Sequence, residues 1–141
     1  MVNNAILIKW LKLVAIFHVL GGIALATDFP SVVWEVYRQE LFSIFNMTTN
    51  SNAEFQSLLT MIVRLFGATV ASWGAIMWIV IQAIEDHGVT KYRLPLVFAL
   101  LIWFVIDCTI SVSHGVYIHL LVNITALMSI LVPLVLLKSE N

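Results

Sequence analysis

Among the polar side chains that interrupt the apolar stretches of this sequence, six are of types that could support acid–base or ligand-binding chemistry. An ionisable group inside hydrocarbon is costly, so such a residue marks either a functional site or a packing contact. An imidazole and a buried carboxylate can relay protons, and a guanidinium can attract an anion. The candidate ligand-binding residues are His18, Arg64, Asp107, Ser111, His119 and Asn123.

Helical spacing groups several of these residues. Asp107, Ser111 and His114 follow the i, i+4, i+7 pattern and share one face, while His119 and Asn123 lie one turn apart. The sequence thus places polar groups on single faces of two consecutive segments.

Arg64 and Asp107 are the two charged residues among these candidates. An uncompensated charge is expensive at membrane depth, so we expect the two to form a buried ion pair. His18 or Asn123 would take the remaining hydrogen bonds. The pair is either a functional site or only a lock between two helices.

Small residues form a second pattern, which predicts packing and not chemistry. Gly67, Ala71 and Gly74 fall on one stripe with Arg64, and Gly22 lies one turn from His18. Such small-residue spacing lets the backbone of a neighbouring membrane helix come close.

The composition identifies the solvent in which these elements must fold. Of the 141 residues, 61% are hydrophobic and only 11% are charged, with a mean hydropathy of +1.00. A single domain of this size could not bury so much apolar surface in water, so a lipid bilayer is expected. The net charge of −1 argues against a nucleic-acid partner, and the single Cys108 excludes an internal disulfide.

Four apolar stretches are long enough to cross the hydrocarbon core as helices. We therefore predict an all-α polytopic membrane protein, a single domain (1–141) built as a four-transmembrane-helix bundle. Pro133 removes one helix hydrogen bond and should loosen the last turns. The predicted spans are residues 5–26, 58–84, 94–112 and 116–137, with a loop at 27–57.

The first stretch has an alternative interpretation. Lys9 and Lys12 precede an apolar run, and residues 24–26 resemble a small-residue cleavage site, so residues 1–26 could be a signal peptide. We expect this segment to be retained as a span, because its removal would leave three helices to bury the polar residues.

The basic residues predict the orientation in the membrane. Cytoplasmic flanks are enriched in Lys and Arg, which places both termini in the cytoplasm. A plasma or inner membrane is favoured, with the endoplasmic reticulum as the alternative. The flanking basic residues that carry this prediction are Lys9, Lys12, Lys91, Arg93 and Lys138.

Residues 27–57 are predicted to form the one long loop, on the outer side. Val33, Tyr37, Leu41 and Ile44 recur at helical spacing after Pro30. This pattern is typical of a short amphipathic helix lying in the membrane interface. Such a helix is either a lid over a site or a simple connector.

The alternating directions of the spans should bring the polar residues to one depth. At about 1.5 Å per residue, Arg64 and Asp107 fall in the outer half of the membrane, as do His119 and Asn123. His18 falls a few Å outside the midpoint of its span. We therefore expect one polar layer and an outward-facing pocket around Arg64 and Asp107.

A short motif carries a family resemblance. Arg64-Leu65-Phe66-Gly67 early in the second span is followed by a polar residue, a serine and Gly115 near the end of the third. This arrangement resembles small four-span proteins of the DoxX-like kind. It is also similar to the scaffold family of the ergosterol C4-demethylation complex, which has Arg-x-Phe-Gly at the matching place. The resemblance implies a non-catalytic or accessory membrane protein.

Three functions remain open at the level of sequence. The first is a small accessory or interaction subunit that associates with itself or with another membrane protein. The second is a binding protein or carrier for a small anionic or hydrophobic ligand. The third is a haem or quinone anchor, in which His18 and His119 would ligate a b-type haem. We predict no catalytic residue, because no hydrolase motif is present, and no metal site or cofactor, because the sequence has no CxxC or CxxCH motif for zinc or covalent haem. Enzyme activity is left open but is not favoured.

Overall fold

The computed structural model describes residues 3–27, 35, 39, 42–44 and 53–138. These residues form four long α-helices and, among them, no strand, which confirms the predicted all-α class. All four helices are long and apolar enough to cross a membrane. Their bounds are α1 Asn4–Ala26, α3 Ala53–His87, α4 Val89–Ser113 and α5 Tyr117–Leu136.

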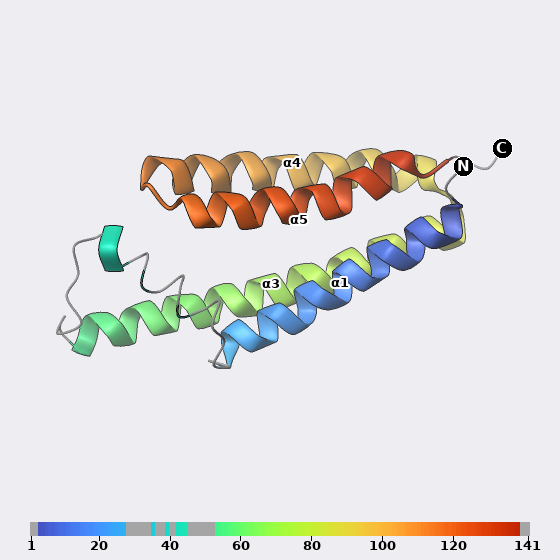
Figure 1. Ribbon diagram of the computed structural model, residues 1–141. Coiled ribbons are helices and arrows are strands. Elements are labelled where there is room, and N and C mark those ends of the chain that lie inside the picture. Colours follow the sequence, from blue (N-terminus) through green and yellow to red (C-terminus); the bar gives the residue numbers. More distant parts are fainter. Residues whose placement is uncertain (1–2, 28–34, 36–38, 40–41, 45–52, 139–141) are drawn as a thin grey trace.

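The four helices run in alternating directions and form two pairs, α1 with α3 and α4 with α5 (Figure 1). We call the end that contains Asn4, Gly88 and Leu136 the terminal end, because both chain termini lie there. The opposite end, which contains Ala26, Ala53 and Gly115, is the loop end. The two pairs are close together at the terminal end and farther apart at the loop end (Figure 1).

Helix α3 is longer than the expected span of 58–84, because it begins at Ala53 and ends at His87. Hydropathy identifies only the part of a helix that suits hydrocarbon, whereas the backbone hydrogen bonds continue into polar flanks. For the same reason α4 begins at Val89 and not at residue 94. Only Gly88 separates the two helices, with φ of 88° and ψ of 154°, a conformation that is essentially restricted to glycine.

The predicted amphipathic helix between the first two spans lies mostly outside the described residues. Glu35, Gln39 and residues 42–44 are described, and all of them are helical. Gln39 Nε2 donates a hydrogen bond of 3.1 Å to Glu35 Oε1, and Phe42 is buried.

The hydrophobic core lies in the terminal half of the bundle, and all four helices contribute to it. Outside this cluster, the buried hydrophobic residues of the described part are Phe42, Cys108 and Val116. The core therefore joins the two helix pairs near the termini. Its members that are fully buried include Leu11, Met77, Ile81, Leu100, Ile130 and Leu134.

Pro133 supplies an acceptor that ties α5 to α1. Because proline has no N–H, the carbonyl of Ser129, four residues earlier, lacks its helical donor. The indole Nε1 of Trp10 on α1 donates to this carbonyl at 2.9 Å. The sequence predicts only that Pro133 loosens the last turns, whereas in the structure the acceptor that it leaves is used by a neighbouring helix.

Further polar contacts close the terminal end. The side chain of Asn4 donates to the Lys138 carbonyl at 2.9 Å and accepts from the Lys138 N–H at 3.1 Å. Arg93 donates to the Leu137 carbonyl at 2.9 Å. These contacts satisfy the carbonyls of Leu137 and Lys138, which follow the last residue of α5.

Lys12 ties α1 to the end of α3. Its ammonium donates to Gln82 Oε1 at 2.8 Å and forms an ion pair with Glu85. The same ammonium lies 5.5 Å from the ring centroid of Trp78. A lysine that the sequence marked only as an orientation signal therefore also connects two helices.

Glycines hold α1 against α3 over the loop half. A Cβ added to Gly22 would lie 2.3 Å from the Ala71 nitrogen, and one added to Gly67 would lie 2.5 Å from the Ala26 nitrogen. A Cβ on Gly74 would lie 2.8 Å from the Val19 nitrogen. The small-residue stripe of the second span thus packs directly on the backbone of the first.

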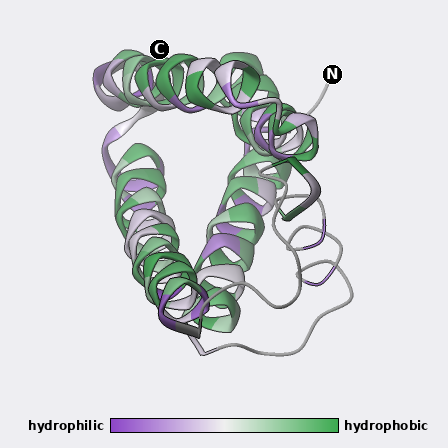
Figure 2. Cartoon of the chain, turned by 90° about the vertical axis from the view of Figure 1, so that its left-hand side faces the viewer, coloured by the Kyte–Doolittle hydropathy of each residue, from purple (hydrophilic) through white to green (hydrophobic). Residues whose placement is uncertain are grey.

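The surface is compatible with lipid on every helix. Large hydrophobic side chains are exposed along all four, and the view from the loop end in Figure 2 shows hydrophobic residues on each of them. Exposed hydroxyls bond to carbonyls of their own helix, as Thr69 does to Leu65 at 3.0 Å and Thr125 to Leu121 at 2.9 Å. In hydrocarbon, where no water is available, a polar group must form its hydrogen bonds within the protein in this way.

Candidate functional site

The turn between α4 and α5 positions the candidate site. Gly115 has φ of 74°, its N–H bonds to the Val112 carbonyl, and the next N–H, of Val116, bonds to the Ser111 carbonyl at 2.9 Å. This is the Schellman pattern of helix termination, in which glycine adopts the left-handed conformation. The turn folds the first turn of α5 back onto the last turns of α4.

Asp107, Ser111 and His119 meet beside this turn, and we call these three residues the polar cluster. His119 Nδ1 lies 3.0 Å from Ser111 Oγ and 3.6 Å from Asp107 Oδ1. Ser111 is buried, whereas the side chains of His119 and Asp107 are 20% and 19% exposed. The cluster thus joins α4 to α5 at the loop end and remains partly accessible.

The hydrogen bonds of the polar cluster indicate which atom carries each proton. The Ser111 hydroxyl donates to the Asp107 main-chain carbonyl at 2.8 Å. Its single proton is then used, so the contact with His119 is donated by Nδ1–H. In a Ser-His-Asp triad the hydroxyl and the carboxylate approach opposite ring nitrogens. Here both approach Nδ1, so the cluster does not have the geometry of an activated serine nucleophile.

Asn123 lies one turn further along α5 than His119. It is 2% exposed, and its Nδ2 donates to the thiol sulfur of Cys108 at 3.8 Å. The pair Asn123–Cys108 therefore continues the α4–α5 contact that the polar cluster begins. From the sequence, Cys108 was considered only as a possible disulfide or metal-binding residue, and its contact with Asn123 was not predicted.

His114 departs from the predicted face of α4, because the helix ends there. It is exposed, and its Nδ1 contacts the Ile110 carbonyl at 2.9 Å.

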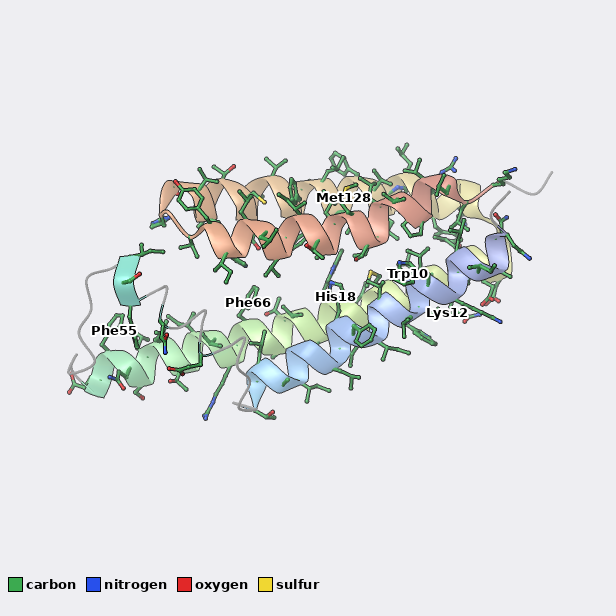
Figure 3. All side chains as sticks on the ribbon, in the orientation of Figure 1. Trp10, Lys12, His18, Phe55, Phe66 and Met128 are labelled. Atoms are coloured by element: carbon green, nitrogen blue, oxygen red, sulfur yellow. The ribbon has the colours of Figure 1, made fainter. Side chains whose placement is uncertain are left out.

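Helix α3 reaches the polar cluster through Phe66. The rings of Phe66 and His119 pack edge to face with centroids 6.3 Å apart. In Figure 3 both Phe66 and His18 extend from the α1–α3 pair towards the α4–α5 pair. Within the Arg64-Leu65-Phe66-Gly67 motif, Phe66 is therefore the residue that contacts the polar cluster.

The predicted ion pair between Arg64 and Asp107 is not present among the ion pairs of the described residues. Asp107 lies instead beside His119, which is close to it because of the short α4–α5 turn. Arg64 is an exposed residue of α3. The charged partner that the structure gives Asp107 is therefore the imidazole of the adjoining helix, which the pairing of formal charges did not consider.

His18 does not lie at the depth of the polar cluster. Its Cβ is 2.9 Å from the position of a Cβ on Gly74, and Gly74 follows Phe66 by just over two helical turns, or about 12 Å. His18 Nδ1 donates to the Val14 carbonyl at 2.8 Å, within its own helix. The expected single polar layer is therefore divided, and the offset does not support joint ligation of one haem iron by His18 and His119.

The terminal end contains a recess that the sequence did not indicate. Its lining includes Asn4, Ile8, Asp86, Gly88 and Lys138. This recess lies at the opposite end of the bundle from Arg64 and Asp107, around which the sequence predicts an outward-facing pocket. Of the contacts between helices at this end, only the one between Trp10 and Ser129 could have been suspected from the sequence. Pro133 has no N–H, so the Ser129 carbonyl is left as an acceptor.

No family model, no curated protein and no solved structure matches this chain.

Proposed function

We propose that this chain is a small accessory or interaction subunit embedded in a membrane. One observation carries the proposal: four of the six candidate polar residues, Asp107, Ser111, His119 and Asn123, join neighbouring helices of the chain itself. Ser111, His119 and Asn123 contact α4–α5 partners, and Gly22 and Gly67 pack α1 on α3. Among the described residues, all four helices also expose large hydrophobic side chains.

The exposed faces support a membrane environment for this function. Ile79, Leu94, Phe98 and Leu121 are each at least 65% exposed. In water such faces would promote aggregation, whereas in a bilayer they contact lipid or another transmembrane protein. We therefore propose the bilayer and a membrane protein, another copy of the chain included, as partners, and propose no cofactor.

The proposed orientation has both termini in the cytoplasm of a plasma or inner membrane. Its support is that Lys9, Lys91 and Lys138 are exposed at the terminal end. The resemblance of the Arg64–Gly67 motif to small four-span accessory families agrees with this role. It adds no specific partner.

The proposal is tested by extracting the tagged chain from native membranes in polymer-bounded lipid discs. A second protein chain, identical or different, is expected in fixed stoichiometry with the tagged one. The matched control carries the same tag on an unrelated four-span protein extracted in parallel. Discs that hold one copy and lipid only, across several extraction polymers, would overturn the proposal.

Partial exposure of the polar cluster favours one alternative, the binding of a small anionic amphiphile at the loop end. Asp107 and His119 each leave about one-fifth of the side chain accessible. Dodecanoate is a suitable probe, and its binding would be measured for the parent, Arg64→Gln and Asp107→Asn. Binding that survives both substitutions would show that these residues do not form a ligand site.

A further inference from the structure

The carboxylate of Asp107 receives no close hydrogen bond from the described part of the chain. Its nearest donors are Ser111 Oγ, 3.5 Å from Oδ1, and His119 Nδ1, 3.6 Å from the same oxygen. Both donors are already engaged, because the Ser111 hydroxyl donates to the Asp107 main-chain carbonyl and His119 Nδ1–H donates to Ser111. Hydrogen bonds to a carboxylate are about 2.7–2.9 Å long. Oδ1 therefore has two loose contacts, and Oδ2 has none among the described residues.

Asn123 is a second polar group with unused hydrogen-bonding capacity, and it is enclosed by protein. It is 2% exposed, and its one side-chain contact within the described residues joins Nδ2 to the Cys108 sulfur at 3.8 Å. An amide offers two donor hydrogens and an acceptor oxygen, and a thiol is only a weak acceptor. The amide oxygen and one N–H thus lack a partner in this part of the chain, which is unfavourable for a buried group.

The Asp107 carboxylate and the Asn123 amide lie about one helical turn apart in the same α4–α5 interface. The His119 ring lies beside Asp107 and precedes Asn123 by four residues on α5. Residues with this spacing have Cβ atoms about 5–6 Å apart. One water that makes two hydrogen bonds of about 2.8 Å each spans such a gap. It can accept from the Asn123 N–H and donate to the Asp107 carboxylate, and it is small enough for an enclosed position.

The interface is open to water from the loop end and closed from the terminal end. Asp107 precedes Ser113, the last residue of α4, by six residues, or about 9 Å. The side chains of Asp107 and His119 remain partly exposed there. Beyond Asn123, every buried residue of α5 is apolar. A route of polar groups therefore runs inward from the α4–α5 turn and ends at Asn123.

We infer that water enters the α4–α5 interface from the loop end and bridges the Asp107 carboxylate to the Asn123 amide. The water supplies the carboxylate with a close donor, which the described residues do not provide. Ionisable residues of membrane spans commonly face water in this way. Asp107 then exchanges protons with the compartment at the loop end. The inference goes beyond the proposed subunit role, and its failure would leave that role standing.

The thiol of Cys108 is a natural reporter for the first test. It is the only cysteine of the chain, and it contacts Asn123. Its infrared S–H band is followed in bilayers after transfer from H2O to D2O. We expect exchange in the parent to be several-fold faster than in Asn123→Leu, which removes the amide that holds the water. Thr125→Val, at an exposed position with its hydroxyl bonded within its own helix, should leave the rate unchanged. Equal rates in the parent and Asn123→Leu would overturn the inference.

A second measurement uses the chain without any substitution. Solid-state NMR in bilayers measures how fast magnetisation from water reaches each labelled side chain at short mixing times. Fast transfer is expected at His119, Asp107 and the Asn123 amide. Transfer should be several-fold slower at Leu127 and Ile130, which lie deeper along α5. Transfer to Asn123 as slow as that to Leu127, or transfer to Asp107 mainly from lipid chains, would overturn the inference.

Discussion

The terminal end and the loop end of the bundle are held together in different ways. At the terminal end a core with residues from all four helices is reinforced by contacts between helices that are distant in sequence, such as Trp10 with Ser129. At the loop end the helices are joined mainly in pairs, by glycine contacts in α1–α3 and by the polar cluster in α4–α5. The ring contact of Phe66 with His119 links the pairs there.

This difference indicates which end of the bundle fixes the arrangement of all four helices. A core packed from four helices tolerates little change in volume, so the terminal end fixes the arrangement. The loop end carries the partly exposed polar cluster, and α3 extends past the other helices there (Figure 1). The substitutions below examine how each end is held.

The largest effect is expected for Gly22→Ala, which tests the backbone contact at the loop end. Its Cβ would meet the Ala71 nitrogen at 2.3 Å and the Gly67 carbonyl oxygen at 2.6 Å, so α1 must move away from α3. We expect a loss of about 3 kcal/mol in the free energy of unfolding, measured by denaturant titration in mixed micelles.

Gly21→Ala is the matched control, because nothing lies within 4 Å of its added Cβ. Alanine should stabilise the helix there by about 0.5 kcal/mol. Similar effects of the two substitutions would contradict close packing of α1 on α3.

The turns at Gly88 and Gly115 should differ in which substitutions of the glycine they tolerate. Gly88→Ala is expected to cost about 2 kcal/mol, because a φ of 88° with a ψ of 154° strains any residue that has a Cβ. Gly88→Asn should cost as much. Gly115→Asn should cost less than Gly115→Ala, since asparagine is accepted at the left-handed position of a Schellman turn. Thermal unfolding of the four variants in one detergent gives the comparison.

Ser111→Ala tests the polar cluster. Removing the hydroxyl takes away the acceptor of the His119 Nδ1–H, and we expect a loss of about 1.5 kcal/mol. The double variant Ser111→Ala, His119→Phe should recover part of this loss, because the donor is removed as well. Ser113→Ala, at an exposed position of the same helix, serves as the control. If it costs as much, the cluster does not stabilise the α4–α5 turn.

The smallest effect is expected at the terminal end, for Trp10→Phe. The change removes the donor to the Ser129 carbonyl and should cost about 1 kcal/mol. In a Pro133→Ala background the helix regains its own donor to that carbonyl, so Trp10→Phe should cost less there. An unchanged cost would mean that the indole acts through packing and not through this hydrogen bond.

Much of the fold and part of the candidate site could be predicted from the sequence. Hydropathy located four spans, and the i, i+4 spacing placed Asp107 and Ser111 on one face, where the structure has them in contact. Neither hydropathy nor the spacing of residues could decide whether Arg64 pairs with Asp107. Formal charge gives no information on which helices are neighbours or how they are rotated. The separation of His18 from the polar cluster along the bundle could not be predicted either, because a count of residues along each span ignores the offset between helices.

The sequence by itself determined the number and length of the apolar helices, because hydrophobicity and helical period are local properties of the chain. Only the tertiary structure decided which partner each polar residue has. His119 reaches Asp107 and Ser111 because the turn at Gly115 sets the register of α5 on α4. Trp10 reaches Ser129 because the core brings α1 against α5. Register and rotation between helices arise from contacts among distant residues, which no pattern within one helix encodes.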